Sequence, residues 1–455
     1  MVPDLATFAV DDGFAYSIPD GLRVEVGSLV RVPLGGRTVR GFVVDVKEGS
    51  PEGLKPLRGV SGQGPVFGGR LLEVLRWAAR HYVAPVAVLL GRSAPPNLPP
   101  GKAPAGGGEV EARGSSPVPA VTEASAGGKK VPAVYLLQGS DPGVWLPATV
   151  GPVLRAGRSV LLMAPTGAEV EMLASDARGW AAERLVPVLP DLSDRDTTEC
   201  WAIAAHRPGA LIIGTPRVAL WPVAGLGLAV IVEEGRRAMK DRQTPTLHVR
   251  EVLGTRARVE RLNLLFVGQM PSSELVAAGV EVVRPPGRSR AWPLVEVVDR
   301  SDDPPGSGLV TGRARLALRH TLESGGRAFV FTHRRGYAPA FRCASCRRLC
   351  RCPGCGYRSE PGTGCPRCGT ELGACPDCGA GTFEPLGAGV GRVTEELLRV
   401  LGSGRVAAAP EDAPVRVGTE RDLAGLAAVD LAVVVDADGL ALGSNYRAAE
   451  EALRV

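Results

Sequence analysis

The chain has 455 residues, of which 45% are hydrophobic, and its formal net charge is +5. This length and apolar content predict a globular protein of two to four domains. The longest apolar runs are strand-length and interrupted by charge, which excludes a transmembrane helix of about 20 apolar residues. The N-terminal sequence MVPDLATFAVDDGF has no basic leader followed by an apolar run, so we expect a cytosolic protein.

Residues 1–93 contain short alternating strands and turns, FAYSIPDG, GSLVRVPLGG and VRGFVVDV, followed by the helical pattern LLEVLRWAARHY. They predict a small β-rich module. Residues 94–131 lack apolar periodicity and are dominated by Pro, Gly, Ala and Ser. We interpret them as a flexible linker.

Beyond residue 131, apolar runs (SVLLMAP, GALIIGT, LAVIVEE, LNLLFVG) alternate with helix-compatible stretches. This alternation predicts a buried parallel sheet and therefore an α/β lobe over residues 132–290. A second set, RAFVFTH and LAVVVDADG, predicts a second α/β lobe over 291–341 and 382–455. The cysteine-rich residues 342–381 are then an insertion into the second lobe.

Eight of the ten cysteines form four Cys-x-x-Cys pairs: Cys343/Cys346, Cys352/Cys355, Cys365/Cys368 and Cys375/Cys378. A two-residue gap lets both thiolates of a pair reach one metal ion, and two pairs complete a closed tetrahedral shell. The pattern predicts two structural Zn²⁺ ions per chain with no open position for catalysis. Disulfides, redox dithiols and iron–sulfur ligands are the alternatives. Spacing alone allows three ways of combining the pairs.

Two cysteines are left over. Cys350 lies two residues before Cys352 and could compete as a metal ligand. Cys200 is expected to be a buried small hydrophobic residue.

Positive charge gathers around the cysteines. Residues 333–379 hold eight arginines against three acidic residues, while the remainder of the chain is neutral. These arginines could neutralise zinc-bound thiolates, or they could contact the phosphates of nucleic acid.

The whole chain resembles the PriA (primosomal protein N′) family of bacterial replication-restart helicases. FAYSIPDGLRVEVGSLVRVPLGGR and RWAARHYVAP resemble the start and end of that family's 3′-DNA-binding domain. LGLAVIVEEG, FVGQMPSSE and DADGLALGSNYRAAE resemble helicase motifs II and III and the stretch before motif VI. FVFTHRRGYAPAFRC followed by four cysteine pairs resembles the zinc-binding insertion. The resemblance implies two RecA-like lobes behind a β-rich 3′-DNA-binding module.

The resemblance also implies a nested combination of the cysteine pairs. The outer pairs would hold one zinc, Cys343, Cys346, Cys375 and Cys378, and the inner pairs the other, Cys352, Cys355, Cys365 and Cys368.

Several helicase residues are replaced. Where the resemblance places the phosphate loop, after the strand AVYLL, the sequence is QGSDPGVWL, without the Lys-Ser/Thr that such a loop needs. Motif II reads VEEG, which puts Val232 at the metal-binding Asp and leaves Glu233 and Glu234, whose ordinary interpretation is a solvated strand edge. The chain stops at Val455, where the arginine-containing motif VI should begin, so the C-terminal part of lobe 2 is expected to be missing. We therefore predict no catalytic residues and no use of ATP or Mg²⁺.

The DNA contacts that the resemblance implies are altered in part. In the domain that this region resembles, an acidic residue between two aromatic residues helps to recognise the 3′-hydroxyl of a DNA strand. Here that position is Ala15, between Phe14 and Tyr16, and alanine cannot accept the hydrogen bond. The aromatic rings could still stack on a base or pack in the core. The candidate DNA-binding residues are Phe14, Tyr16, Gly35, Gly36, Arg334, Arg335, Arg347 and Arg348.

These features predict a PriA-like protein that binds stalled replication forks and promotes primosome assembly and reloading of the replicative helicase, without helicase activity. The expected partners are forked or single-stranded DNA, primosome proteins, the replicative helicase or its loader, and single-stranded-DNA-binding protein, with no membrane. A nucleoid-associated cytoplasmic location follows. One alternative is a weak DNA-dependent ATPase or 3′–5′ helicase, and another is a zinc-ribbon module in transcription or RNA metabolism.

Overall fold

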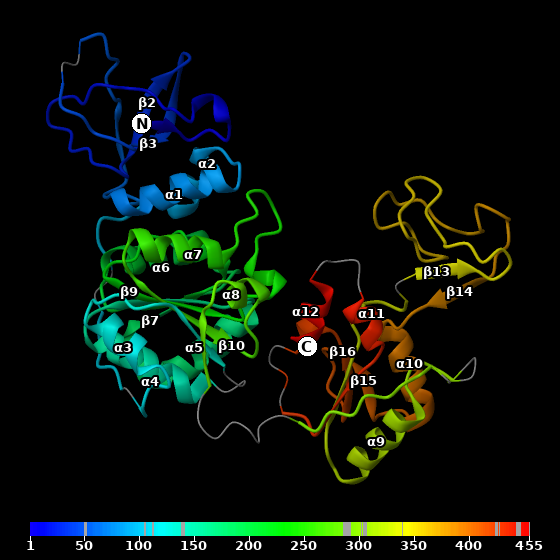
Figure 1. Ribbon diagram of the computed structural model, residues 1–455. Helices are drawn as coiled ribbons and strands as arrows, with labels where there is room; N and C mark the ends of the chain where they lie inside the picture. The colour runs from blue at the N-terminus through cyan, green and yellow to red at the C-terminus, as the bar shows by residue number, and fades with distance from the viewer. Residues whose placement is uncertain are drawn as a thin grey trace. The chain divides into compact units, whose positions relative to one another are not determined.

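The computed structural model describes residues 1–49, 52–103, 106–111, 113–137, 142–284, 293–301, 303, 307–338, 340–423, 426, 428–442 and 447–454. They form two compact units, Met1–Ala291 and Trp292–Val455 (Figure 1). Among the described helices, none is long and apolar enough to cross a membrane.

The N-terminal module is a four-stranded antiparallel sheet in the order β1-β3-β2-β4. A two-residue turn joins β2 and β3, and both of its residues, Gly35 and Gly36, have positive φ (55° and 77°), as a tight hairpin turn requires. The elements are β1 (Val2–Pro3), η1 (Phe8–Val10), β2 (Leu29–Leu34), β3 (Arg37–Phe42), β4 (Gly59–Ser61), α1 (Gly69–His81) and α2 (Val86–Ser93).

Helices α1 and α2 join this module to the first lobe. Their apolar side chains belong to the same core cluster as α6, α7 and one face of the large sheet. Polar contacts fix the junction: the Trp201 ring N–H donates to the carbonyl of Ser93 at 2.7 Å, and the backbone N–H of His248 donates to the Tyr82 hydroxyl at 3.0 Å. Module and lobe are therefore one folding unit.

The first lobe is built on a seven-stranded parallel sheet in the order β11-β5-β10-β9-β6-β8-β7. Its strands are β5 (Val134–Leu137), β6 (Ser159–Met163), β7 (Leu185–Val188), β8 (Leu211–Gly214), β9 (Leu226–Val232), β10 (Asn263–Gly268) and β11 (Glu281–Val283). Its helices are α3 (Pro119–Ala126), α4 (Pro142–Arg155), α5 (Gly167–Ala181), α6 (Asp194–His206), α7 (Val249–Val259) and α8 (Ser273–Ala277), with short 3₁₀ turns η2 (Ala182–Arg184), η3 (Pro216–Val218) and η4 (Arg237–Met239).

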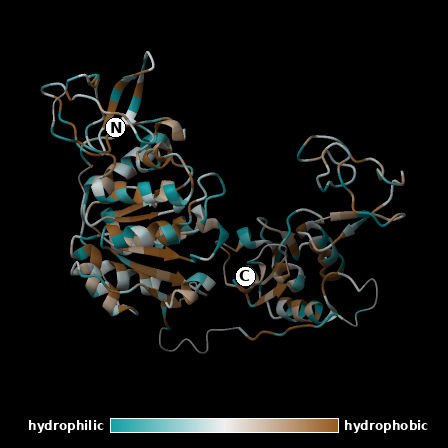
Figure 2. Cartoon of the chain, turned by 45° about the horizontal axis from the view of Figure 1, so that its top comes forward, coloured by the Kyte–Doolittle hydropathy of each residue, from teal (hydrophilic) through white to brown (hydrophobic). Residues whose placement is uncertain are grey.

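The sheet has a core on each face. Along β6, Leu161 and Met163 lie in the cluster shared with α6 and α7, whereas Val160 and Leu162 lie in the cluster shared with α3, α4 and α5. Successive strand residues point to opposite faces, so a strand apolar at every position must be covered on both. Figure 2 shows these strands as hydrophobic bands between amphipathic helices.

The prediction of a flexible linker over residues 94–131 is wrong for its C-terminal half. Helix α3 lies within it, and Val118, Val121 and Ala124 are buried. The Asn263 side-chain amide donates to the Ser125 hydroxyl at 3.1 Å and to the carbonyl of Lys129, which ties the segment to β10. A few valines among small residues are enough to bury one helix face, although they show no clear periodicity in the sequence.

The second unit contains a four-stranded parallel sheet in the order β15-β16-β12-β17. Its elements are α9 (Gly312–Glu323), β12 (Ala328–Phe331), α10 (Val390–Leu401), β15 (Val406–Ala408), β16 (Val415–Gly418), η6 (Glu420–Asp422), β17 (Leu431–Val434), α11 (Ala437–Ala441) and α12 (Ala448–Leu453). A separate antiparallel pair, β13 (Ala340–Cys343) and β14 (Phe383–Leu386), leads into and out of the cysteine-rich segment. The two predicted α/β lobes and the insertion in the second are confirmed.

Candidate metal centres and nucleic-acid contacts

Each Cys-x-x-Cys pair lies in the same tight backbone turn. In the second pair, the Gly356 N–H donates to the carbonyl of Cys352 and the Cys352 N–H donates to the carbonyl of Tyr357. The other three pairs repeat these two bonds. The turn directs both thiols of a pair to one side, so two such turns facing each other can enclose an ion.

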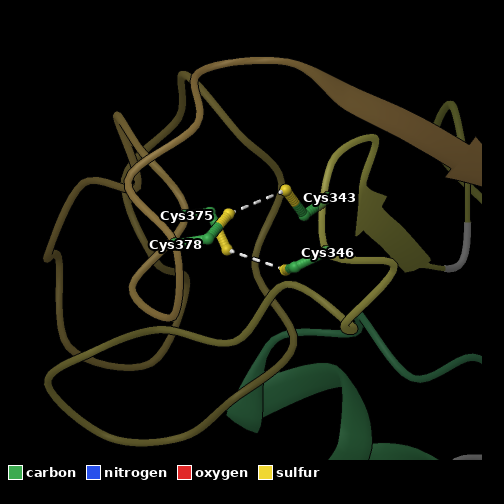
Figure 3. Close-up of side chains that lie close together, drawn as sticks. All are labelled: Cys343, Cys346, Cys375 and Cys378. Atoms are coloured by element: carbon green, nitrogen blue, oxygen red, sulfur yellow. Dashed lines mark hydrogen bonds between the residues drawn. The ribbon is translucent and has the colours of Figure 1, made fainter.

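The structure brings together the two nested groups that the resemblance implied. We call Cys343, Cys346, Cys375 and Cys378 the first cysteine group, shown in Figure 3, and Cys352, Cys355, Cys365 and Cys368 the second cysteine group. Within each group all four sulfurs lie within 4.8 Å of one another.

Sulfur separations between facing pairs fit a tetrahedral metal site. They are 3.5 Å for Cys343–Cys378 and 3.7 Å for Cys346–Cys375 in the first group. The second group has 3.4 Å for Cys352–Cys368 and 3.7 Å for Cys355–Cys365. Four sulfurs at the Zn–S distance of about 2.3 Å are about 3.8 Å apart, so each group matches a closed shell after a small expansion.

At least one thiol in each group has a lowered pKa, whereas other thiols of the same group have a raised pKa. A hydrogen bond from the backbone N–H of Cys346 lowers the pKa of Cys343 to about 7. A hydrogen bond with the Thr370 side chain lowers the pKa of Cys368 to about 6. Metal binding requires thiolates, so these thiols favour metal uptake at neutral pH.

Neither leftover cysteine belongs to a cysteine group. Cys350 is 3% exposed, and burial raises the pKa of its thiol to about 11, so it stays neutral beside the ligands. Cys200 is half-buried on α6, where burial likewise raises its pKa to about 11. This agrees with a packing role for Cys200.

One of the four turns carries an unusual residue. The position after the second cysteine is glycine in three turns, Gly356, Gly369 and Gly379, with φ between 71° and 77°. In the first turn this position is Arg347, at φ 65°. A left-handed conformation costs a non-glycine residue about 1–2 kcal/mol, and such strain is often retained for function.

Replacing Arg347 by glycine is expected to stabilise the first cysteine group by roughly 1 kcal/mol, because glycine adopts positive φ without strain. Zinc release to a chelator should then be about fivefold slower than from the unchanged protein. The matched control is Arg348→Gly, which removes an ion pair with Asp377 (3.0 Å) and should speed release. Equal rates for Arg347→Gly and the unchanged protein would contradict the argument from strain.

The structure separates the four candidate arginines by their surroundings. Arg334 and Arg335 are exposed just beyond the end of β12, and Arg347 is exposed on its turn. Arg348 is exposed too, but its charge is compensated by Asp377. The adjacent Tyr337 donates its hydroxyl hydrogen to Glu395 at 2.7 Å, which orients the ring against α10.

In the N-terminal module, the two candidate aromatics differ in exposure. Phe14 is 41% exposed, and its backbone is bonded to that of Met1 in both directions. Tyr16 packs against the small core of the sheet and donates its hydroxyl hydrogen to the carbonyl of Pro33 at 3.0 Å. Tyr16 thus supports the strand that leads into the Gly35–Gly36 turn, and Phe14 offers the more accessible ring.

Asp11, an acidic residue close to Phe14 in the chain, has a hydrogen-bonding partner in helix α2. The Asp11 carboxylate accepts a hydrogen bond from the backbone N–H of Val86 at 3.1 Å, at the start of α2. Asp12 and Ala15 are exposed. Asp12 is therefore the exposed aspartate close to Ala15, whereas Asp11 serves to cap the start of α2.

The interpretation of the motif II carboxylates as a solvated edge is wrong for Glu234. Its side chain is fully buried and pairs with Arg250 at 2.8 Å, and it accepts a hydrogen bond from the backbone N–H of Ser272 at 2.8 Å. The Arg250 guanidinium also donates to the Ser272 hydroxyl at 3.0 Å. Glu234 therefore links the end of β9 to α7 and to the start of α8. Sequence reasoning missed Arg250, since nothing in the sequence marks it as the partner.

Two more carboxylates near this edge of the sheet, those of Glu233 and Glu169, also have hydrogen-bonding or ion-pair partners. Glu233 has a positive φ of 51° and accepts a hydrogen bond from the backbone N–H of Gln269 at 2.7 Å. Glu169, at the start of α5, pairs with Arg236 at 2.5 Å. The strand AVYLL contributes β5 and α4 follows it, but residues 138–141 of the expected phosphate-loop position lie outside the described residues.

These features define a class of protein. It has two parallel α/β lobes, preceded in the chain by an antiparallel β module, and two four-cysteine centres inserted in the second lobe. The family described as the 3′DNA-binding domain (3′BD) of PriA matches residues 3–95. A probable replication restart protein PriA of Mycobacterium leprae (strain TN) is 30% identical over 417 residues, covering 82% of this chain and 63% of that protein. The chain is thus similar to PriA replication restart proteins over 82% of its length, and its residues 3–95 match the PriA 3′DNA-binding domain.

The other similar proteins match different shares of this chain and of their own length. The replication restart protein PriA of Treponema pallidum (strain Nichols) is 24% identical over 452 residues, covering 92% of this chain and 68% of that protein. The chain spans less than two thirds of the length of the mycobacterial relatives. Among solved structures, the Escherichia coli DEAH/RHA helicase HrpB shares 16% identity at a TM-score of 0.31, covering 72% of this chain and 35% of that one. That likeness carries no argument about function.

Proposed function

We propose that this chain is a replication restart protein that binds abandoned replication forks and promotes primosome assembly without unwinding DNA itself. The observation that carries the proposal is the match of residues 3–95 to the 3′DNA-binding domain of PriA. Exposed Phe14 and the hairpin tip at Gly35 and Gly36 are the contacts we assign to a DNA end.

The two cysteine groups are proposed to hold one structural Zn²⁺ each, because four thiolates at these separations suit a tetrahedral ion. The ion would supply rigidity and leave no position open for substrate. The insertion would then act as a stable platform for primosome proteins, the replicative helicase or its loader, and single-stranded-DNA-binding protein. A DNA-bound role places the protein in the cytoplasm at the nucleoid.

The absence of ATP-driven unwinding is supported by the edge of the first lobe. Glu234 and Glu169 are held in ion pairs with Arg250 and Arg236. The sequence has no lysine between Lys130 and Lys240, the span that includes the phosphate-loop position. Phosphoryl transfer depends on a lysine and a metal-binding aspartate near the phosphates, and each lost contact of this kind reduces the rate on the order of 10²-fold or more.

The first test is equilibrium binding of the zinc-loaded protein to a labelled three-way fork, a matched duplex and a single strand at several salt concentrations. We expect the fork to bind about tenfold more tightly than the duplex, a difference of about 1.4 kcal/mol. Affinity should fall as salt rises, because phosphate contacts release counterions. Equal weak binding to all three DNAs contradicts fork recognition. Preference for single-stranded RNA favours a zinc-ribbon module of RNA metabolism instead.

The second test is ATP turnover with and without fork DNA. We expect no DNA-stimulated hydrolysis above the background of a Glu233→Gln variant. Turnover that DNA stimulates and that Glu233→Gln abolishes would establish the alternative of a weak ATPase or helicase.

A further inference from the structure

A pocket of about 460 Å³ lies on the cysteine-rich insertion, beside the second cysteine group. Four arginines line it, Arg334, Arg351, Arg358 and Arg367, together with Tyr357 and Cys355. They come from three separate stretches of the chain, since Arg334 precedes the insertion and Arg367 lies in the third cysteine pair. Folding therefore brings four of the eight arginines of residues 333–379 around one hollow.

The backbone around the second cysteine pair holds the pocket in shape. Arg351 and Arg358 face each other across an antiparallel bridge, and Arg351 donates a hydrogen bond to the carbonyl of Gly356 at 3.3 Å. The Tyr357 carbonyl accepts a bond from the backbone N–H of Cys352 at 2.7 Å. Arg334 is tied to the lobe by a parallel bridge to Gly389. These bonds fix the positions from which the side chains project.

The charge in the pocket exceeds what the metal site needs. A Zn²⁺ ion with four thiolates carries a charge of −2, whereas four guanidiniums carry +4, and among the described residues no acidic side chain lines the pocket. Two other arginines of the insertion have acidic partners: Arg342 pairs with Glu384 at 2.7 Å, and Arg348 pairs with Asp377. Arginines gathered in a hollow without acidic lining suit a bound anion.

Tyr357 points to the kind of anion. It is 48% exposed at the rim of an arginine pocket, and an exposed aromatic ring beside clustered guanidiniums suits a base that follows a phosphate. Paired bases in a duplex offer no free face for such stacking, so an unpaired strand fits better.

We propose that this pocket binds the phosphate backbone of single-stranded nucleic acid, with a neighbouring base stacked on Tyr357. The inference rests on the proposed DNA-binding function and adds a site outside the N-terminal module. Arg351, Arg358 and Arg367 become nucleic-acid contacts in addition to Arg334.

The test uses the full zinc-loaded chain and a labelled 20-nucleotide oligo(dT). Arg358→Ala/Arg367→Ala is expected to bind the strand about tenfold more weakly, with the slope of log K against log salt reduced by about 1.4, or about 0.7 for each lost phosphate contact. The control Arg319→Ala/Arg405→Ala removes two exposed arginines from the same unit and should bind within about twofold of the unchanged protein.

Tyr357 is tested by a pair of variants. Tyr357→Ala should weaken strand binding at least about fivefold, because a stacked base contributes about 1–3 kcal/mol, whereas Tyr357→Phe keeps the ring and should bind normally. Zinc content is measured for every variant, and about two ions per chain are expected throughout.

The outcomes separate this inference from the proposed function. If the unchanged protein binds no DNA, the proposed function fails. If it prefers forks but the Arg358/Arg367 variant behaves like the control, the pocket inference alone is overturned. Loss of zinc with unchanged strand binding would assign the arginines to neutralising the thiolates. Loss of binding to a labelled poly-glutamate peptide, with strand binding intact, would instead assign the pocket to an acidic protein segment.

Discussion

Replacing all four thiols of the first cysteine group by serine is expected to leave about one zinc ion per chain, because the second cysteine group contains its own complete set of ligands. The unchanged protein should hold about two. If the pairs instead combined in chain order, first with second and third with fourth, the same variant would lose a pair from each site and hold no tightly bound zinc. Metal content measured after gel filtration distinguishes the two arrangements.

The effect on folding should be large and local. Structural zinc contributes about 10–16 kcal/mol to the folding of small zinc domains at neutral pH, so the outer part of the insertion should unfold in this variant. Protease cleavage within residues 340–386 would report that unfolding. The control is Cys350→Ala, which changes a buried thiol outside both groups and should retain about two zinc ions. Loss of one ion from Cys350→Ala would show that Cys350 is a ligand.

Replacing Glu234 by alanine is expected to destabilise the first unit by about 3–5 kcal/mol. The change removes the one fully buried carboxylate that pairs with the Arg250 guanidinium and leaves it only the partly exposed Glu251 and Glu274. It also removes the acceptor of the Ser272 backbone N–H. Stripping one member from a buried ion pair has this cost because water cannot solvate the remaining charge. Urea unfolding, followed by tryptophan fluorescence, measures the change.

Glu251→Ala is the matched control for Glu234→Ala. Glu251 pairs with the same Arg250 at 3.1 Å, but its side chain is 45% exposed, so its loss should cost at most about 1 kcal/mol. If Glu234→Ala also lowered the free energy of unfolding by only about 1 kcal/mol, the structural role of Glu234 would be contradicted. Glu234 would then again be a candidate catalytic carboxylate.

Much of the architecture could be predicted from the sequence because its signals are local. Strand-length apolar runs such as LAVIVEE and LNLLFVG predict buried parallel strands, which are β9 and β10. Cys-x-x-Cys spacing predicts metal-binding turns, since each turn is complete within a few residues. The segment 94–131 shows the limit of this reasoning, because its composition of small residues concealed helix α3.

Neighbouring residues encode the local elements of this protein, namely the strands and helices of two α/β lobes, a β-rich module and four cysteine turns. Which turns face each other was decided only by the tertiary structure, because spacing allows three combinations and folding selects the nested one. The same holds for the Glu234–Arg250 pair and for the four-arginine pocket. Glu234 and Arg250 are 16 residues apart and the pocket arginines are spread over residues 334–367, so only tertiary packing sets the distances and burial that give them their chemistry.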